Sequence, residues 1–204
     1  MWDFAEMSSD EVASLRARYE PLTQSIRELI DAALHVDADN QVVDQAKAQI
    51  DAAAELLRAH PASTRQGMAL TPEGESIPWD NLGNGIRNPL APPLVVEHTG
   101  PTSARIDVEL GAAYEGPPGH VHGGYCALVL DQILGEVASR GSIETVAATG
   151  TISLRYLRPT KLGRLHVEAE IQRTEGRKIF ITGHIADEDG TTVTAEGLFI
   201  VLRQ

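Results

Sequence analysis

Residues 116–138 read GPPGHVHGGYCALVLDQILGEVA. A loop of glycine and proline ends at His122, two glycines follow, and the rest is apolar on every face of a helix, which predicts a buried helix. A carboxylate, Asp131, lies in the middle of that run, where burial is costly unless the group is paired, hydrated or used. The glycines permit close approach and leave the first helical N–H groups open to an anion or a developing oxyanion. This segment is therefore the candidate site.

The composition limits the classes of protein to be considered. The chain has 204 residues, which allows one domain or one domain with an extension, and its 42% hydrophobic content is enough for a core. Its net charge of −12 argues against a nucleic-acid binder, which usually has a basic balance. Residues 151–178 are an exception, with seven bases against three acids. That basic segment is either a site for a phosphorylated small molecule or a solvated strand surface.

Three further signals concern chemistry and location. The single cysteine, Cys126, excludes an intrachain disulfide and is expected to be a buried thiol. No apolar run is long enough to cross a membrane, and the acidic N-terminus is unlike a signal peptide, so we expect a cytoplasmic protein. His120 and His122 form a His-x-His pair without a nearby cluster of ligands, so we expect no metal.

The N-terminal region, residues 1–60, has the pattern of two helices. Ser8 and Glu11 form a capping-box signature before a helical pattern that continues to Leu34, and Pro21 is expected to break or kink it. A second helix is predicted over residues 40–60. The two helices form an antiparallel hairpin that is a packing appendage, a lid or a dimer element.

A connector, residues 61–93, follows; it is rich in proline and glycine and has no predicted element of its own. Beyond it, in residues 94–204, the apolar pattern changes to period two. Strands are predicted over residues 104–110, 146–157, 165–173, 178–187 and 191–202. One long helix between strands of an antiparallel sheet is an α+β layout.

This layout resembles the hotdog fold, in which an antiparallel sheet wraps around a long central helix. The similarity is most specific to acyl-CoA thioesterases of the PaaI-like and thioesterase superfamily member 4-like type. Those proteins carry His-Gly-Gly at the head of the helix and an acid nine residues after the histidine, as His122 and Asp131 do here. They also carry a threonine strand before an Arg-Pro turn, here Thr149 and Arg158-Pro159. The resemblance covers residues 94–202.

The resemblance implies hydrolysis of an acyl-CoA thioester by a homodimer or a dimer of dimers, with no cofactor besides the CoA of the substrate. It implies that the Gly123 N–H binds the oxyanion, that Asp131 is nucleophile or general base, and that His122 and Thr149 assist. We assign substrate contacts to Gly124 as well. The contacts with the CoA phosphates are assigned to the basic residues around the Arg-Pro turn, Arg155, Arg158, Lys161 and Arg164.

Helix geometry adds an inference that is independent of the family. Gly123 and Asp131 are eight residues apart, which is roughly 12 Å along a helix. One thioester carbon cannot lie within about 3 Å of both groups of one chain. If both groups act on one substrate, they must therefore come from different protomers around a two-fold axis. Thr149 and Thr151 are both expected to face the helix, because strand residues two apart share a face.

Two other functions remain open. A dehydratase or hydratase of acyl thioesters on the same fold would use a histidine with an acid on the helix. A non-catalytic acyl-CoA-binding regulator would use residues 1–60 as an interaction module. The full motif spacing and the threonine strand favour hydrolysis. The sequence leaves open the acyl group, the choice between nucleophile and base for Asp131, and the choice between dimer and tetramer.

Overall fold

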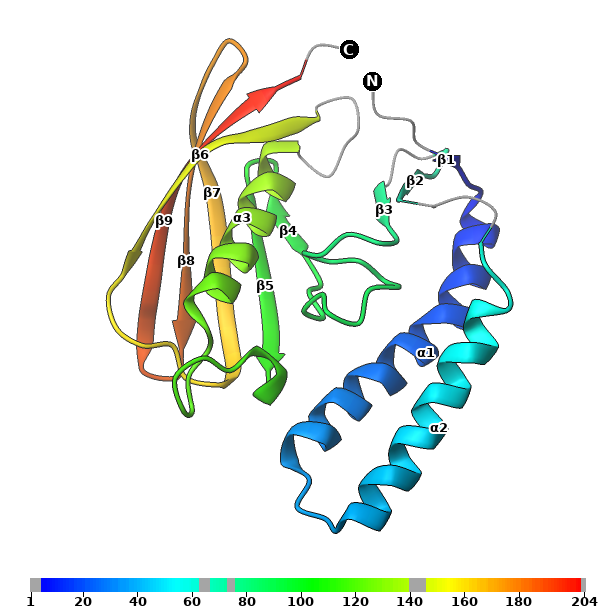
Figure 1. Cartoon of the computed structure of the whole chain (residues 1–204). Helices are drawn as coiled ribbons and strands as arrows, with labels where there is room; N and C mark the ends of the chain where they lie inside the picture. The colour runs from blue at the N-terminus through cyan, green and yellow to red at the C-terminus, as the bar shows by residue number, and fades with distance from the viewer. Residues whose placement is uncertain (1–4, 63–66, 73–75, 140–145, 203–204) are drawn as a thin grey trace.

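The computed structural model describes residues 5–62, 67–72, 76–139 and 146–202. It confirms the predicted α+β hotdog fold: a six-stranded antiparallel sheet with α3 (Gly123–Ser139) lying across one face (Figure 1). The strand order is β4-β5-β7-β8-β9-β6. The strands are β4 (Glu97–Gly100), β5 (Ser103–Leu110), β6 (Ala147–Tyr156), β7 (Gly163–Glu175), β8 (Lys178–Asp187) and β9 (Gly190–Val201).

The main core lies between this sheet and α3. Along β5 every second residue is buried, from Ala104 to Leu110, as the period-two pattern predicts. Small residues let the helix approach the sheet closely: a Cβ added to Gly183 or Gly197 would lie 2.7 Å from the side chain of Leu134. A bulkier residue at either position would therefore push α3 away from the sheet.

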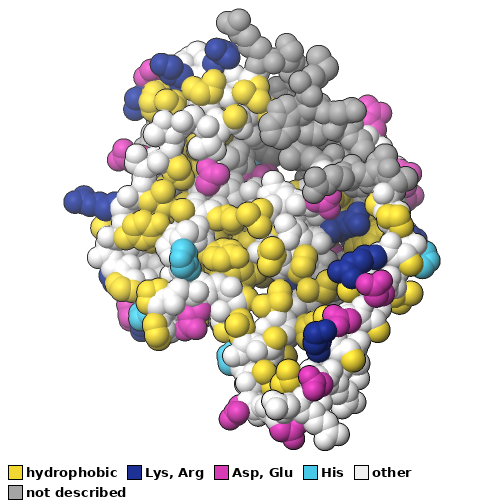
Figure 2. Space-filling model, viewed as in Figure 1, with side chains coloured by type: hydrophobic (Ala, Val, Ile, Leu, Met, Phe, Trp, Pro, Cys, Tyr) yellow, Lys and Arg dark blue, Asp and Glu magenta, His cyan; other side chains and the backbone are white. Residues whose placement is uncertain are grey.

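The opposite side of α3 is less covered. The helix buries Cys126, Val129, Leu130, Ile133, Leu134, Val137 and Ala138 against the sheet. Ala127 and Leu128 of the same helix are only partly buried. Hydrophobic side chains gather over the middle of the face that carries α3 in Figure 1 (Figure 2). The chain itself therefore leaves part of this apolar helix uncovered.

Strand β6 forms one edge of the sheet and contains an irregularity. It pairs with β9, and among the described residues no strand pairs with its other edge. The register shifts between Thr149 and Thr151, so Thr149 lies opposite Phe199 while Thr151 lies opposite Leu198. The extra residue, Gly150, is a β-bulge that reverses which side chains face α3 beyond it.

The N-terminal region contains the two predicted helices and a small sheet. Helix α1 (Ser9–His35) begins with the predicted capping box, and α2 (Asn40–Arg58) has no buried residue. Helix α1 continues through Pro21, which corrects the expected break. The strands β1 (Ala5–Glu6), β2 (Met68–Leu70) and β3 (Ser76–Pro78) form the small sheet, so the connector has elements of its own.

A second, smaller core joins these parts. It consists of Val12, Ala69, Ile77 and Trp79, each at most 7% exposed. Farther along α1, the Arg27 guanidinium donates to the carbonyl oxygens of Asn88 at 3.4 Å and Ala91 at 3.1 Å. The Tyr114 hydroxyl, in the short helix η1 (Ala112–Tyr114), donates to the same Ala91 oxygen. The connector is thereby fastened to α1 on one side and to the hotdog domain on the other.

Candidate active site

The head of α3 carries two glycine N–H groups with different surroundings. In the part of the chain that the structure describes, the Gly123 N–H makes no hydrogen bond. The Gly124 N–H donates to Nδ1 of His122 at 3.0 Å, which makes His122 the capping residue of the helix. Because an N–H can only donate, a neutral His122 must hold its proton on Nε2. The exposed ring therefore presents an N–H to the outside.

The loop before the helix is held by the segment between β6 and β7 and by the short helix η1. The Val121 N–H donates to the Thr160 carbonyl at 2.9 Å, and the Leu162 N–H donates to the Gly119 carbonyl at 3.0 Å. The His122 N–H donates to the Tyr114 carbonyl at 2.9 Å. These bonds fix the direction in which the free Gly123 N–H points, because they bind the backbone immediately before it.

Tyr156, which is not among the residues predicted from the sequence, also contacts the head of the helix. Its hydroxyl donates to the Gly123 carbonyl oxygen at 2.8 Å. A Cβ added to Gly123 would lie 3.4–3.6 Å from the tyrosine ring, which is ordinary contact. The available signal was an aromatic residue at the end of a strand, two positions before Arg158 in the Arg-Pro turn.

The second part of the site is the carboxylate of Asp131. It is partly buried on α3 and accepts a hydrogen bond from the Thr149 hydroxyl at 2.8 Å. Thr149 therefore lies beside the carboxylate that it was expected to assist. Thr151 is a correction: the bulge at Gly150 places it opposite Leu198, on the face turned away from α3. The signal for the bulge was a glycine inside a strand.

Gly123 and Asp131 belong to one unbroken helix. Their separation is therefore the roughly 12 Å that eight residues of α-helix impose. The structure brings Thr149 to Asp131 and both His122 and Tyr156 to the head of the helix. Within one chain, the structure does not bring the Gly123 N–H and the Asp131 carboxylate together.

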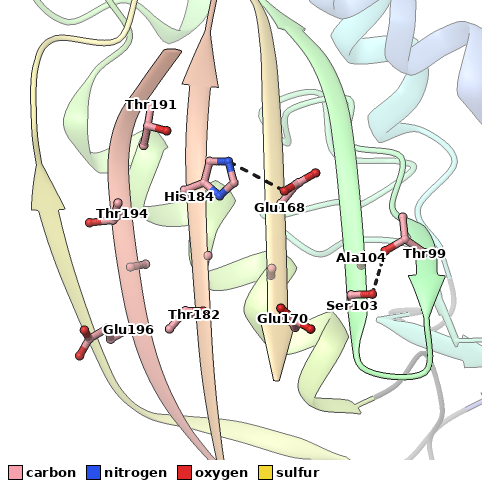
Figure 3. Close-up of a pocket in the computed structure, with 13 residues that line it drawn as sticks. Thr99, Ser103, Ala104, Glu168, Glu170, Thr182, His184, Thr191, Thr194 and Glu196 are labelled. Atoms are coloured by element: carbon pink, nitrogen blue, oxygen red, sulfur yellow. Dashed lines mark hydrogen bonds and ion pairs between the residues drawn. The ribbon is translucent and has the colours of Figure 1, made fainter. Parts of the chain in front are cut away.

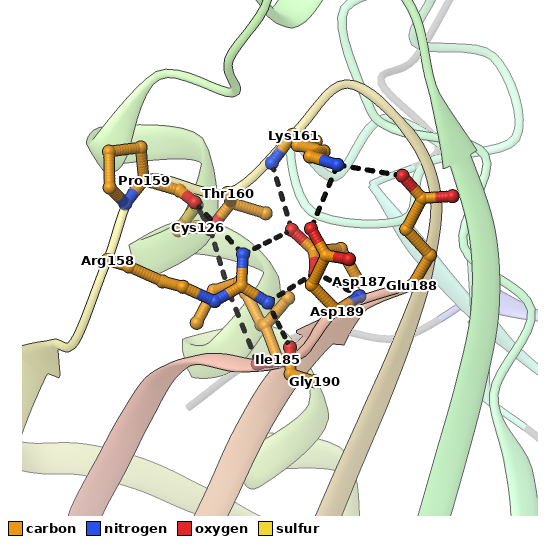
Figure 4. Close-up of polar contacts among 11 residues, drawn as sticks. Cys126, Arg158, Pro159, Thr160, Lys161, Ile185, Asp187, Glu188, Asp189 and Gly190 are labelled. Atoms are coloured by element: carbon orange, nitrogen blue, oxygen red, sulfur yellow. Dashed lines mark hydrogen bonds and ion pairs between the residues drawn. The ribbon is translucent and has the colours of Figure 1, made fainter.

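Two of the four predicted phosphate contacts are paired with acids of the β8–β9 turn (Figure 4). Arg158 donates to both carboxylate oxygens of Asp187, and its guanidinium also donates to the Gly190 carbonyl. The Arg158 guanidinium holds the pKa of the Asp187 carboxyl at about 2. Lys161 pairs with Glu188 at 2.8 Å and Asp189 at 2.9 Å, and its pKa is raised by both.

The other two basic residues are available. Arg155 is exposed on β6, and Arg164 lies near the start of β7. Among the described residues neither side chain has a hydrogen-bond or ion-pair partner. A phosphate contact therefore remains a prediction for all four residues, and it requires the fewest rearrangements at Arg155 and Arg164.

Other candidate groups have simpler surroundings. Cys126 is buried as predicted, and burial raises the pKa of its thiol, which argues against a reactive role. In the described ranges no group of three His, Cys, Asp or Glu side chains is arranged to hold a metal ion. None of the described helices is both long and apolar enough to cross a membrane.

A hollow of the described surface lies elsewhere. It has a volume of about 610 Å³ and is on the face of the sheet turned away from α3, where Glu168, Glu170 and Glu196 point outward beside His184 (Figure 3). None of the predicted site residues lines it. Its three carboxylates make it unsuitable for a polyphosphate. We therefore place the candidate site on α3 and not in this hollow.

Comparisons with known proteins relate the chain to thioesterases. The model of the family described as "Thioesterase superfamily" matches residues 118–194, a range that includes the head of α3, Asp131 and Thr149. The chain is similar to a thioesterase superfamily protein of known crystal structure, with 34% sequence identity. The match covers 89% of this chain and 94% of that protein's chain, with a TM-score of 0.79. That coverage extends beyond the hotdog domain into the N-terminal region.

Curated relatives match a shorter part. Acyl-coenzyme A thioesterase THEM4 of Mus musculus is 36% identical over 95 residues, which is 45% of this chain and 40% of the relative. The chain thus spans about two-fifths of the length of the curated relatives it matches. A hypothetical thioesterase protein with coenzyme A from Streptococcus pneumoniae is 21% identical over 54% of this chain and 87% of its own, with a TM-score of 0.50, and shares the fold.

Proposed function

The chain belongs to the thioesterase superfamily, and from that membership we propose that it hydrolyses an acyl-CoA thioester to the free acid and CoA. The observation that carries the proposal is the Gly123 N–H, which stands at the positive end of α3 without a partner among the described residues. Attack on a thioester builds negative charge on the carbonyl oxygen, and one preorganised N–H donor stabilises that charge by about 3 kcal/mol.

Asp131 supplies the attacking group in one of two ways. As a nucleophile, its carboxylate adds to the thioester carbon, the thiolate of CoA leaves, and water then hydrolyses the mixed anhydride. As a general base, it removes a proton from the water that attacks, and that proton is available for the leaving sulfur. The hydrogen bond from Thr149 orients the carboxylate in either case.

The site is shared between two protomers. The roughly 12 Å between Gly123 and Asp131 on one helix excludes joint action within one chain. The partly exposed apolar side of α3 and the unpaired edge of β6 provide surfaces for a second copy, because long open strand edges favour pairing. We therefore retain the homodimer or dimer of dimers, in which Gly123 of one chain meets Asp131 of the other.

The state of the His122 ring favours hydrolysis over dehydration. A dehydratase would need the histidine as a base, with a lone pair directed at the substrate. Here Nδ1 accepts the Gly124 N–H, so the outward nitrogen of the neutral ring carries a proton. His122 is suited to donate a hydrogen bond to the substrate.

The contacts with CoA are a separate part of the proposal. The side chains of Arg155 and Arg164, free among the described residues, are the first choice for the CoA phosphates. Gly124, Arg158 and Lys161 are the other predicted contacts.

Replacing Gly123 by proline and by alanine tests the proposal. Proline removes the N–H at the first helical position, where its ring is tolerated. Alanine keeps the N–H, and its Cβ meets Tyr156 at an ordinary 3.4 Å. Thiol release from a panel of acyl-CoAs should fall about 10²–10³-fold in kcat for Gly123→Pro, stay within a few-fold for Gly123→Ala, and vanish for Asp131→Asn. Equal activity of the proline and alanine variants, or full turnover by Asp131→Asn, contradicts the proposal.

A further inference from the structure

Three hydrogen-bonded groups follow one another at the head of α3. The Tyr156 hydroxyl donates to the carbonyl oxygen of Gly123 at 2.8 Å. That carbonyl belongs to the same peptide unit as the Gly124 N–H, which donates to Nδ1 of His122 at 3.0 Å. The phenol, the peptide unit and the imidazole therefore form one continuous chain of hydrogen bonds.

The peptide unit transmits the effect of one bond to the other. Resonance joins the carbonyl oxygen and the nitrogen of a peptide, so a donor on the oxygen makes the N–H of the same unit a stronger donor. The Tyr156 hydroxyl thereby strengthens the bond from Gly124 to Nδ1 of His122. That bond keeps Nδ1 unprotonated and leaves the proton of the neutral ring on Nε2.

We propose that Tyr156 is a positioning residue for two substrate-facing donors, the Gly123 N–H and the Nε2–H of His122. The ring packs against Gly123 and its hydroxyl holds the first peptide unit of the helix, which sets the direction of the neighbouring N–H. Through Gly124 it fixes the tautomer and orientation of His122. The role rests on the proposed function, because both donors are directed at the oxygen of a thioester.

The hydrogen bond from Tyr156 to the Gly123 carbonyl is not needed to form the helix. A regular helix already bonds the Gly123 carbonyl to the N–H four residues later, so Tyr156 is a second donor on that oxygen. The Tyr156 side chain is also 52% exposed and adds little to the core. Removing only its hydroxyl should therefore cost the fold little, while the two donors at the helix head lose their support.

Tyr156→Phe removes the hydroxyl and keeps the ring. The matched control is Tyr114→Phe, which removes another hydroxyl that donates to a backbone carbonyl, that of Ala91. We expect kcat of Tyr156→Phe to fall about three- to tenfold, the factor that one ordinary hydrogen bond supplies, with KM within about twofold. The Nδ1 signal of His122 in ¹⁵N imidazole spectra, assigned by its loss in His122→Ala, should move toward that of an unbonded acceptor nitrogen. Tyr114→Phe should change neither quantity.

The proposal requires both the fall in kcat and the shift of the Nδ1 signal in Tyr156→Phe. Either one without the other overturns it. A wild-type spectrum with the proton on Nδ1 of His122 overturns it as well, as does an equal loss of kcat in Tyr114→Phe. The spectra need no substrate. If the wild type released thiol from no acyl-CoA, the proposed function would fail, and an unchanged Nδ1 signal in Tyr156→Phe would still refute the hydrogen-bonded chain by itself.

Discussion

Replacing Arg158 with methionine should destabilise the fold more than it weakens substrate binding. The guanidinium donates to both oxygens of Asp187 and to the Gly190 carbonyl at 2.7 Å, and the Asp187 side chain is only 2% exposed. Methionine would leave that carboxylate buried without its charged partner. The first consequence of the substitution is therefore a loss of stability at the turn between β8 and β9.

The size of the loss follows from the pKa of Asp187. Mainly through the Arg158 bond, that pKa falls from 3.8 to about 2, a difference worth about 2.4 kcal/mol. Arg158 is 31% exposed, so water screens part of the interaction, and the N–H groups of Lys161 and Asp189 still bind the carboxylate. We expect a loss of about 2 kcal/mol. Because the folded pKa lies below the unfolded one, the contribution is complete above about pH 4 and disappears as pH falls toward 2.

Urea unfolding of the wild type, Arg158→Met, Asp187→Asn and the double variant measures this coupling as a double-mutant cycle. The coupling energy should be about 2 kcal/mol at pH 7 and smaller at pH 3. Arg155→Met is the control: it should change the free energy of unfolding by less than about 0.5 kcal/mol while raising KM for acyl-CoA. An Arg158→Met protein as stable as the wild type, with only KM raised, would refute the reasoning.

Two further predictions concern Asp131 and Gly123, the proposed catalytic groups. Thr149→Val should lower kcat about 10–100-fold, because the Asp131 carboxylate loses a hydrogen bond to a charged group, and Thr151→Val, on the other face of β6, should leave it unchanged. Equal losses in the two variants would contradict the placement of the bulge. Mixing Gly123→Pro chains with Asp131→Asn chains should restore up to about a quarter of the sites, since a two-fold dimer gives each mixed pair one intact site. No recovery of thiol release after subunit exchange would count against a shared site.

Local patterns were sufficient for the elements of the hotdog domain. Strand alternation and the position of turns depend on neighbouring residues, so β5 and the β6–β9 strands follow from the sequence. Helix α1 shows where local rules fail. Pro21 removes one helical hydrogen bond, but burial of Val12 on one side and of Thr23 on the other holds both halves of the helix in line. Tertiary contacts of this kind cannot be read from helix-breaking signals.

The candidate site divides in the same way. The spacing of His122 and Asp131 could be predicted because the first caps α3 and the second lies on it, within a single segment. The partners of Arg158 were not, because its carboxylate lies 29 residues away on another turn. A cluster of basic residues in the sequence predicts a positive surface only when no acidic residues lie beside it in the fold. Here the acidic residues of the β8–β9 turn pair with Arg158 and Lys161.

The bulge at Gly150 connects the two halves of the site. Thr149 and Tyr156 are seven residues apart, and in a regular strand an odd separation places two side chains on opposite faces. The extra residue changes the alternation once, so Thr149 opposite Phe199 and Tyr156 opposite Val193 both face α3. One edge strand can then donate to Asp131 in the middle of the helix and to Gly123 at its head. Without the bulge, alignment of Thr149 with the carboxylate would direct Arg155, and not Tyr156, toward the helix side.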